Sequence, residues 1–199
     1  MIVIVDYGMG NLRSVQKAFQ RVGYEAEITS SPQRVRQADA VVLPGVGAFG
    51  EAMANLSRAG LVDVLRQVAT DRPFIGICLG QQLLFEESEE MGRHEGLGIL
   101  PGKVIRFEGP LKVPHMGWNQ IHIVRSSPIL TGVDDGSFAY FVHSYYVAPA
   151  DPTVILGTTD YGVTFASIVG RHQLFGLQFH PEKSQSVGLT MLANFAAMT

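Results

Sequence analysis

Short apolar runs followed by segments with helical periodicity constrain the fold of this chain more than any other feature. Three such runs are MIVIV (1–5), VVLPG (41–45) and FIGIC (74–78), each short enough for a strand. After the first run, apolar residues recur at steps of three and four, as on one helix face: Leu12, Val15, Phe19 and Val22. Alternating strands and helices of this kind are typical of a parallel sheet covered on both faces.

Helix boundaries can be predicted in the same way. Asn11 is expected to cap the first helix, Gly23 to end it, and EAEIT (25–29) to form the next strand. FIGIC runs directly into GQQLLFEES (80–88), which has the pattern of a helix. Two further helical patterns are formed by Met53, Leu56, Leu61, Val64, Leu65 and Val68, and by Val187, Met191, Leu192 and Phe195.

The pattern changes between about Lys103 and Pro181. Short β-rich runs, separated by Gly, Pro and Asp, replace the helices there: KVIRF, QIHIV, FAYFVHSYYV, TVILGTT, TFASIVG and LFGLQFH. The sequence therefore predicts one α/β domain over residues 1–199. Its central sheet is expected to be mostly parallel, with helices on both faces and an antiparallel β extension.

Composition and charge exclude several functions. The formal net charge is −3 and there is no basic run, which argues against nucleic acid or anionic lipid as a partner. The apolar run Ile2–Val5 is too short for a signal peptide or membrane span, so a cytoplasmic protein is expected. Apolar residues make up 46% and charged residues 17%, which suits either a large buried sheet or an apolar surface that a partner covers.

The only cysteine, Cys78, lies in GICLG, where a strand is expected to pass into a helix. A nucleophile at such a junction occupies a sharp turn, and the residues two before and two after it must be small. Gly76 and Gly80 meet that requirement. The helix N-terminus would favour the thiolate, and the backbone N–H of Leu79 would point at a forming oxyanion. The alternative is a buried cysteine in an ordinary turn.

A cysteine nucleophile needs a base, and FHPE at 179–182 supplies a candidate. On an extended backbone, residues two apart point to the same side, so Glu182 could orient His180. We therefore predict a Cys78–His180–Glu182 triad; the alternative is a strand-end histidine beside a surface glutamate. The remaining histidines other than His143 are predicted to be structural, and no metal-ligand spacing is present: His94, His115, His122 and His172.

The glycines of DYGMGN (6–11) follow an apolar strand, which raises the possibility of a dinucleotide site. That fingerprint requires a third glycine at position 13, where this chain has Arg13. A tight strand-to-helix connection is the better interpretation.

Together these motifs resemble the class I glutamine amidotransferase family. GICLG with Gln82, PGVGAFG (44–50) and FHPE carry the resemblance, which extends from end to end of the chain. Within the family, four motifs are most similar to the glutaminase subunits of imidazole glycerol phosphate synthases: DYGMGN, VPHMGWN (113–119), FVHSYY (141–146) and FHPEKS (179–184).

The resemblance implies a role for each matching residue. Cys78 would be the nucleophile, His180 the general base and acid, and Glu182 the residue that orients it. The oxyanion would be held by the backbone of Leu79 and of the segment Gly45, Val46 and Gly47. L-glutamine would be bound by Gln82, His143, Ser144 and Tyr145.

The same resemblance implies a heterodimer with a (β/α)8-barrel cyclase subunit, which would receive the ammonia released from glutamine. Asn11 and Lys183 would face that partner. No cofactor or metal is expected. Members of the family commonly carry methionine where this chain has Gln81, and little effect is expected beyond packing beneath the cysteine turn.

Three alternatives remain open on the sequence. The chain could be the glutaminase of another synthase, such as the pyridoxal phosphate synthase type, although DYGMGN and VPHMGWN argue against it. It could be a free-standing γ-glutamyl hydrolase that is fully active without a partner. It could also be a catalytically silent scaffold subunit, against which the complete triad argues.

Overall fold

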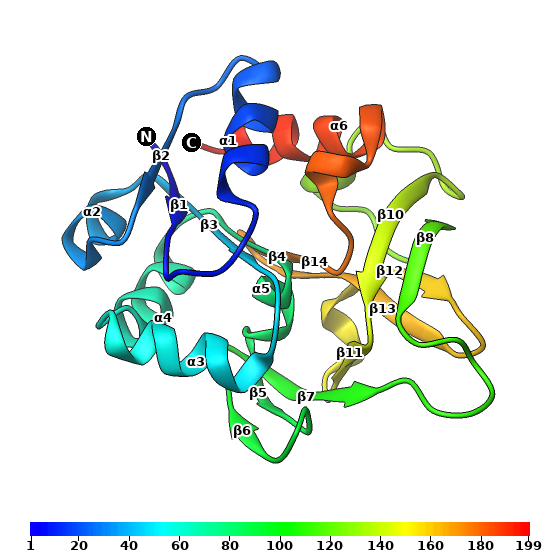
Figure 1. Ribbon diagram of the computed structural model, residues 1–199. Helices are drawn as coiled ribbons and strands as arrows, with labels where there is room; N and C mark the ends of the chain where they lie inside the picture. Colours follow the sequence, from blue (N-terminus) through cyan, green and yellow to red (C-terminus); the bar gives the residue numbers. More distant parts are fainter.

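The computed structural model describes all 199 residues and has an eight-stranded sheet at its centre (Figure 1). The strand order is β2-β1-β3-β4-β14-β13-β12-β9, parallel from β2 to β14 and antiparallel from there to β9. The bounds are β1 Ile2–Val5, β2 Ala26–Thr29, β3 Ala40–Gly45, β4 Phe74–Cys78, β9 His122–Ile123, β12 Ile155–Asp160, β13 Thr164–Arg171 and β14 Leu174–Leu177. The predicted fold class, a mostly parallel sheet with an antiparallel extension, is confirmed.

Helices cover both faces of this sheet. Alternate residues of β1 belong to two separate hydrophobic clusters, Val3 and Val5 to one and Ile2 and Ile4 to the other. The first cluster packs under α2 (Pro32–Gln37), α3 (Phe49–Arg58) and α4 (Val62–Asp71). The second packs under α1 (Leu12–Arg21) and α6 (Gln185–Ala196), which lie side by side in Figure 1.

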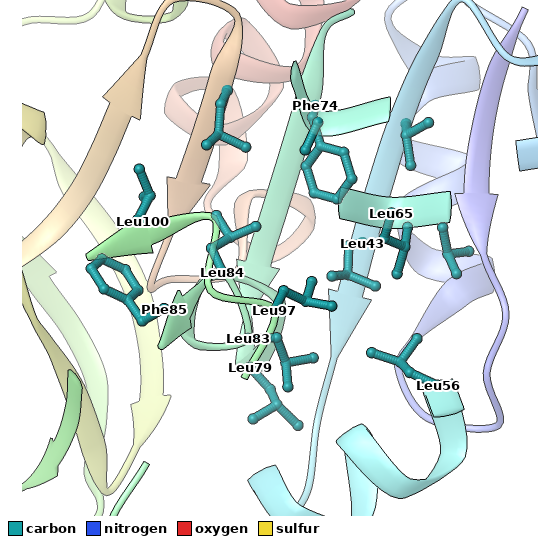
Figure 2. Close-up of a cluster of buried hydrophobic side chains, with 14 of the residues drawn as sticks. Leu43, Leu56, Leu65, Phe74, Leu79, Leu83, Leu84, Phe85, Leu97 and Leu100 are labelled. Atoms are coloured by element: carbon teal, nitrogen blue, oxygen red, sulfur yellow. The ribbon is translucent and has the colours of Figure 1, made fainter. Parts of the chain in front are cut away.

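The cluster under α3 and α4 contains 28 buried residues, and Figure 2 shows part of it against the central strands. Leu43 from β3, Leu56 from α3 and Leu65 from α4 are each 0% exposed. Burying a side chain of this size stabilises the fold by about 1.5–3 kcal/mol. Leu79, which directly follows Cys78, belongs to the same cluster, so the core anchors the cysteine turn.

The ends of α1 match their prediction in part. Gly23 has φ of +90°, and its N–H donates to the carbonyl of Gln20 while that of Tyr24 donates to Phe19, both at 3.0 Å. This is the Schellman arrangement, and it confirms Gly23 as the stop. Asn11 occupies the N-cap position, but its side chain makes no capping hydrogen bond.

Two helix predictions are corrected by the structure. The pattern from Met53 to Val68 is two helices rather than one, because Gly60 at φ of +66° ends α3 before α4 begins. GQQLLFEES is not one helix: α5 covers only Leu79–Gln82, and β5 (Phe85–Ser88) follows. The carbonyls of residues 83–85 accept backbone N–H groups of residues 97–100, and these tertiary bonds override the local helical pattern.

Part of the predicted antiparallel extension lies instead in two separate small sheets, the second of which also contains β5 and has one parallel pairing. One pairs β8 (His115–Gln120) with β10 (Phe138–His143), and the other has the order β11-β7-β5-β6. The remaining bounds are β6 His94–Glu95, β7 Leu100–Arg106 and β11 Tyr145–Pro149. None of the helices has both the length and the apolar character that crossing a membrane requires.

Candidate active site

Cys78 is the last residue of β4 and lies at the sharp turn into α5. Its backbone has φ of +55° and ψ of −112°, an uncommon conformation for a residue other than glycine. The flanking glycines make this turn possible: a Cβ on Gly76 would lie 2.4 Å from the Gly80 carbonyl oxygen, and one on Gly80 only 1.8 Å from that of Leu43. The predicted need for small residues on both sides is confirmed.

His180 and Glu182 form a buried pair. Nδ1 of His180 lies 2.9 Å from Oε1 of Glu182, and the two side chains are 3% and 1% exposed. The predicted contact is confirmed, although it is not made along an extended strand. Residues Pro181–Lys183 form a 3₁₀ turn, and this turn brings the carboxylate back to the imidazole.

The charge state of His180 depends on both of its neighbours. Burial alone would lower the pKa of His180, but the Cys78 sulfur and the Glu182 carboxylate outweigh burial and raise it. Nε2 of His180 is buried and has no other hydrogen-bond partner, and the Cys78 sulfur contributes the largest of the effects that raise this pKa. The arrangement favours an imidazolium ring whenever the sulfur is a thiolate.

Cys78 and His180 open into one cavity of about 430 Å³. Two larger surface hollows, of about 680 and 530 Å³, contain neither residue. Nine of the residues singled out in the sequence line the 430 Å³ cavity: Val46, Gly47, Cys78, Leu79, Gln82, His143, Ser144, Tyr145 and His180. Glu182 stands behind His180, while Asn11 and Lys183 are exposed outside the cavity.

The segment Gly45–Gly47 is held by the glycine-rich loop that follows β1. The hydroxyl of Tyr7 donates a 2.9 Å hydrogen bond to the carbonyl of Pro44. Burial, and to a smaller degree the charge of Cys78, raises the pKa of Tyr7, so this donor keeps its proton. A Cβ on Gly45 would lie 2.5 Å from the Tyr7 hydroxyl oxygen, so only glycine fits there. DYGMGN is thus a tight connection, as predicted, with Gly8 and Gly10 at positive φ.

Two residues missed by the sequence analysis belong to this site. Gln178 is 0% exposed; its Oε1 accepts from Nε2 of Gln82 at 3.1 Å, and its Nε2 donates to Sγ of Cys78 at 3.9 Å. Glu90 lines the cavity and accepts the backbone N–H of Phe49 at 2.7 Å. The available signal for Gln178 was a lone amide in an otherwise apolar strand, which burial obliges to find partners.

Gln81, also fully buried, is less well satisfied. Its Nε2 donates to the carbonyl of Gly176 at 3.4 Å, and its Oε1 has no partner. A buried acceptor without a donor costs about 1–3 kcal/mol. This residue therefore weakens the packing beneath the cysteine turn.

Replacing Gln81 with methionine is expected to stabilise the protein by about 1 kcal/mol, because the unpaired oxygen is removed at similar volume. Thermal unfolding should show a midpoint raised by about 2–4 °C. Gln67→Met, at an exposed position of α4, is the matched control and should leave the midpoint unchanged. A lower midpoint for Gln81→Met would contradict the argument.

Comparison with known proteins agrees with this geometry. The sequence profile "Glutamine amidotransferase class-I" matches residues 3–198. The chain is 59% identical to the imidazole glycerol phosphate synthase subunit HisH of Syntrophotalea carbinolica, with all of both chains covered. It is 52% identical to the HisH subunit of Geobacter sulfurreducens, covering 99% of this chain and 98% of that one.

Solved structures share the fold at much lower identity. The chain resembles the structure of PurLQS from Thermotoga maritima with a TM-score of 0.77 at 16% identity, covering 100% of this chain and 98% of that chain. It resembles the crystal structure of a glutamine amidotransferase with a TM-score of 0.76 at 18% identity, covering 98% of each chain. With a matching profile over nearly its whole length and relatives above 50% identity, this chain belongs to the class I glutamine amidotransferase family.

Proposed function

We propose that this chain is the glutaminase subunit of an imidazole glycerol phosphate synthase. It would hydrolyse L-glutamine to glutamate and ammonia and pass the ammonia to a cyclase subunit. The observation that carries this proposal is the convergence of Cys78 and the His180–Glu182 pair on one cavity. The names of the relatives, at 52–59% identity over nearly the full chain, support the choice of synthase.

The first step is attack by the Cys78 thiolate on the carboxamide carbon of glutamine. The carbonyl π bond opens, and its oxygen becomes an oxyanion held by the backbone N–H of Leu79 and donors of the Gly45–Gly47 segment. The helix that follows Cys78 has only four residues, so its dipole is small and local N–H groups do most of the stabilising. This qualifies the expectation that a helix N-terminus would favour the thiolate.

His180 then transfers its proton to the departing nitrogen. The C–N bond breaks, ammonia leaves, and a γ-glutamyl thioester remains on Cys78. The neutral imidazole next takes a proton from water, whose oxygen attacks the thioester and releases glutamate and the thiolate. Glu182 holds the ring and stabilises its charged form through the 2.9 Å contact with Nδ1.

The other end of glutamine has partners of complementary chemistry. Both amide hydrogens of Gln82 are engaged by Tyr145 and Gln178, which leaves its oxygen to accept a hydrogen bond from the substrate ammonium group. The Glu90 carboxylate is a second partner for that positive charge. His143 and Ser144 complete the wall of the cavity.

A surface beside the site is suited to the cyclase subunit. Met116 and Trp118 from β8 and Phe138 from β10 are large apolar side chains that are 61%, 48% and 53% exposed. Nζ of Lys183 lies 5.9 Å from the ring centroid of Tyr140, which is paired with Trp118 across the two strands. An exposed apolar face with a cation at its edge fits a partner that offers apolar side chains and a carboxylate.

Asn11 lies exposed in the loop that also carries Tyr7. Because Tyr7 holds the carbonyl of Pro44, a partner bound to this loop would act on the oxyanion-binding segment. We therefore expect the isolated chain to release glutamate slowly and the cyclase subunit to stimulate this release.

Glutamate release tests the proposal. It should be slow for the isolated chain and strongly stimulated by the cyclase subunit with its substrate, N′-(5′-phosphoribulosyl)-formimino-AICAR-phosphate. Full activity of the isolated chain would instead indicate a free-standing hydrolase. Absence of release under both conditions would indicate a silent subunit.

A further inference from the structure

The mechanism above makes no use of His115 and Asn119, the two polar residues of VPHMGWN; His115 contacts His143, which lines the glutamine cavity. His115 is only 3% exposed, and its ring stacks between those of Phe141 and Tyr161 at centroid distances of 4.9 and 4.1 Å. His143, at 6% exposed, packs edge-on against it. Two imidazoles in such an aromatic environment require hydrogen-bond partners.

These partners form one continuous chain. Nδ2 of Asn119 lies 3.1 Å from Nε2 of His115, and Nδ1 of His115 lies 2.9 Å from Nε2 of His143. Nδ1 of His143 lies 2.8 Å from the carbonyl oxygen of Tyr145. The same oxygen accepts Nε2 of Gln82 at 3.0 Å. This series of hydrogen bonds therefore links β8 to Gln82, the residue proposed to hold glutamine.

The direction of every bond in this chain is determined by its ends. The Tyr145 carbonyl can only accept, so Nδ1 of His143 carries a proton and its Nε2 is an acceptor. His115 must then donate from Nδ1 and accept at Nε2. At the other end, Nδ2 of Asn119 also donates to the Asp160 carbonyl at 2.8 Å, while its Oδ1 accepts the N–H of Gln120. The amide of Asn119 is thus oriented to donate to His115.

This series of hydrogen bonds is incompatible with a positive charge on either imidazole ring. A second proton on His115 would face the Asn119 amide hydrogens, and one on His143 would face the His115 N–H. Burial acts in the same direction and lowers the pKa of His143 to about 3 and that of His115 to about 4. No carboxylate contacts either ring; their partners are aromatic rings, carbonyls and an amide, and the charge of nearby His180 also lowers the pKa of His143.

We propose that His115 and Asn119 are positioning residues for glutamine binding, acting through His143 and Tyr145 on the amide of Gln82. This inference rests on the proposed function, because it assigns the Gln82 oxygen to the substrate ammonium group. With His143 donating to it, the Tyr145 carbonyl is held in place and the Gln82 N–H is directed to it. The Gln82 oxygen then stays free for the substrate.

Imidazole NMR of the uniformly ¹⁵N-labelled chain tests the direction of the bonds. Both His115 and His143 should be neutral and protonated at Nδ1, the less common tautomer, throughout pH 5–8. Asn119→Ala should release His115 from this tautomer. A ring protonated at Nε2, or an imidazolium signal from either residue in this pH range, would overturn the inference.

Kinetics with the cyclase complex test the consequence. His115→Phe keeps a ring but removes the donor, so KM for glutamine should rise about tenfold, as expected for the loss of one buried hydrogen bond. The kcat and the rate of Cys78 alkylation by iodoacetamide should stay within about twofold, which a general loss of structure would not allow. His115→Asn places an amide N–H near the original Nδ1 and should restore most of the affinity.

His122→Phe, at an exposed histidine of β9, is the matched control. An unchanged KM in His115→Phe, a KM in His115→Asn as high as in His115→Phe, or a parallel fall in kcat and alkylation would overturn the inference. Failure of the proposed function would be seen differently, as absence of glutamate release by the wild-type complex. The NMR result does not depend on turnover, so the two failures can be told apart.

Discussion

Cys78→Ala is expected to reduce glutamate release by the cyclase complex at least about 10⁴-fold, because no other group in the cavity can form the thioester. The fold should be retained. Sγ makes only long contacts, 4.0 Å to the Val142 carbonyl and 3.9 Å to Nε2 of Gln178, and alanine keeps the Cβ. The measurement is steady-state glutamate release at saturating glutamine.

Two controls separate loss of the nucleophile from loss of structure. Cys78→Ala should unfold at the same temperature as the wild-type chain, within a few degrees, and should still bind the cyclase subunit. Residual release above about one part in 10⁴ would mean that another residue or a bound water acts as nucleophile. In that case the role proposed for Cys78 would be wrong.

Gly80→Ala is expected to destabilise the protein by more than about 3 kcal/mol, a large share of the roughly 5–15 kcal/mol by which folded domains are stable. The new Cβ would lie 1.8 Å from the carbonyl oxygen of Leu43. That atom belongs to the central strand β3, which hydrogen-bonds to neighbours on both sides and cannot move away. The overlap can be relieved only by separating α5 from the sheet.

Urea unfolding of soluble protein, or the soluble fraction on expression, measures this effect. Gly23→Ala is the matched control, because a Cβ there meets nothing within 4 Å and only the φ of +90° is unfavourable. Gly23→Ala should lower the free energy of unfolding by about 1 kcal/mol. Similar costs for the two substitutions would show that the close approach at Gly80 is easily relieved.

The sequence alone predicts an element correctly where the local pattern and the tertiary structure agree. The apolar runs ending at Val5, Gly45 and Cys78 became adjacent parallel strands, and the glycines around Cys78 indicated its sharp turn. In each case the physical requirement is local: a fully buried strand, or a residue without a Cβ.

The sequence alone does not predict an element or a site residue where contacts with distant parts of the chain determine the structure. Phe85 continues a helical pattern, yet it lies in β5 because β7 offers a strand partner. Glu182 reaches His180 through a 3₁₀ turn that no periodicity signals. Glu90 and Gln178 were missed for a related reason, since a carboxylate in a loop and an amide just beyond the end of β14 acquire a role only when the fold brings them to the site.

The four-residue length of α5 has a consequence for substrate choice. Cys78 and Gln82 stand at the two ends of one helical turn, which rises about 5.4 Å, and the core fixes that turn through Leu79 and Leu83. The sulfur and the proposed ammonium-binding amide are therefore a constant distance apart. This constant distance selects amino-acid substrates by the number of carbons between the side-chain carboxamide and the α-amino group.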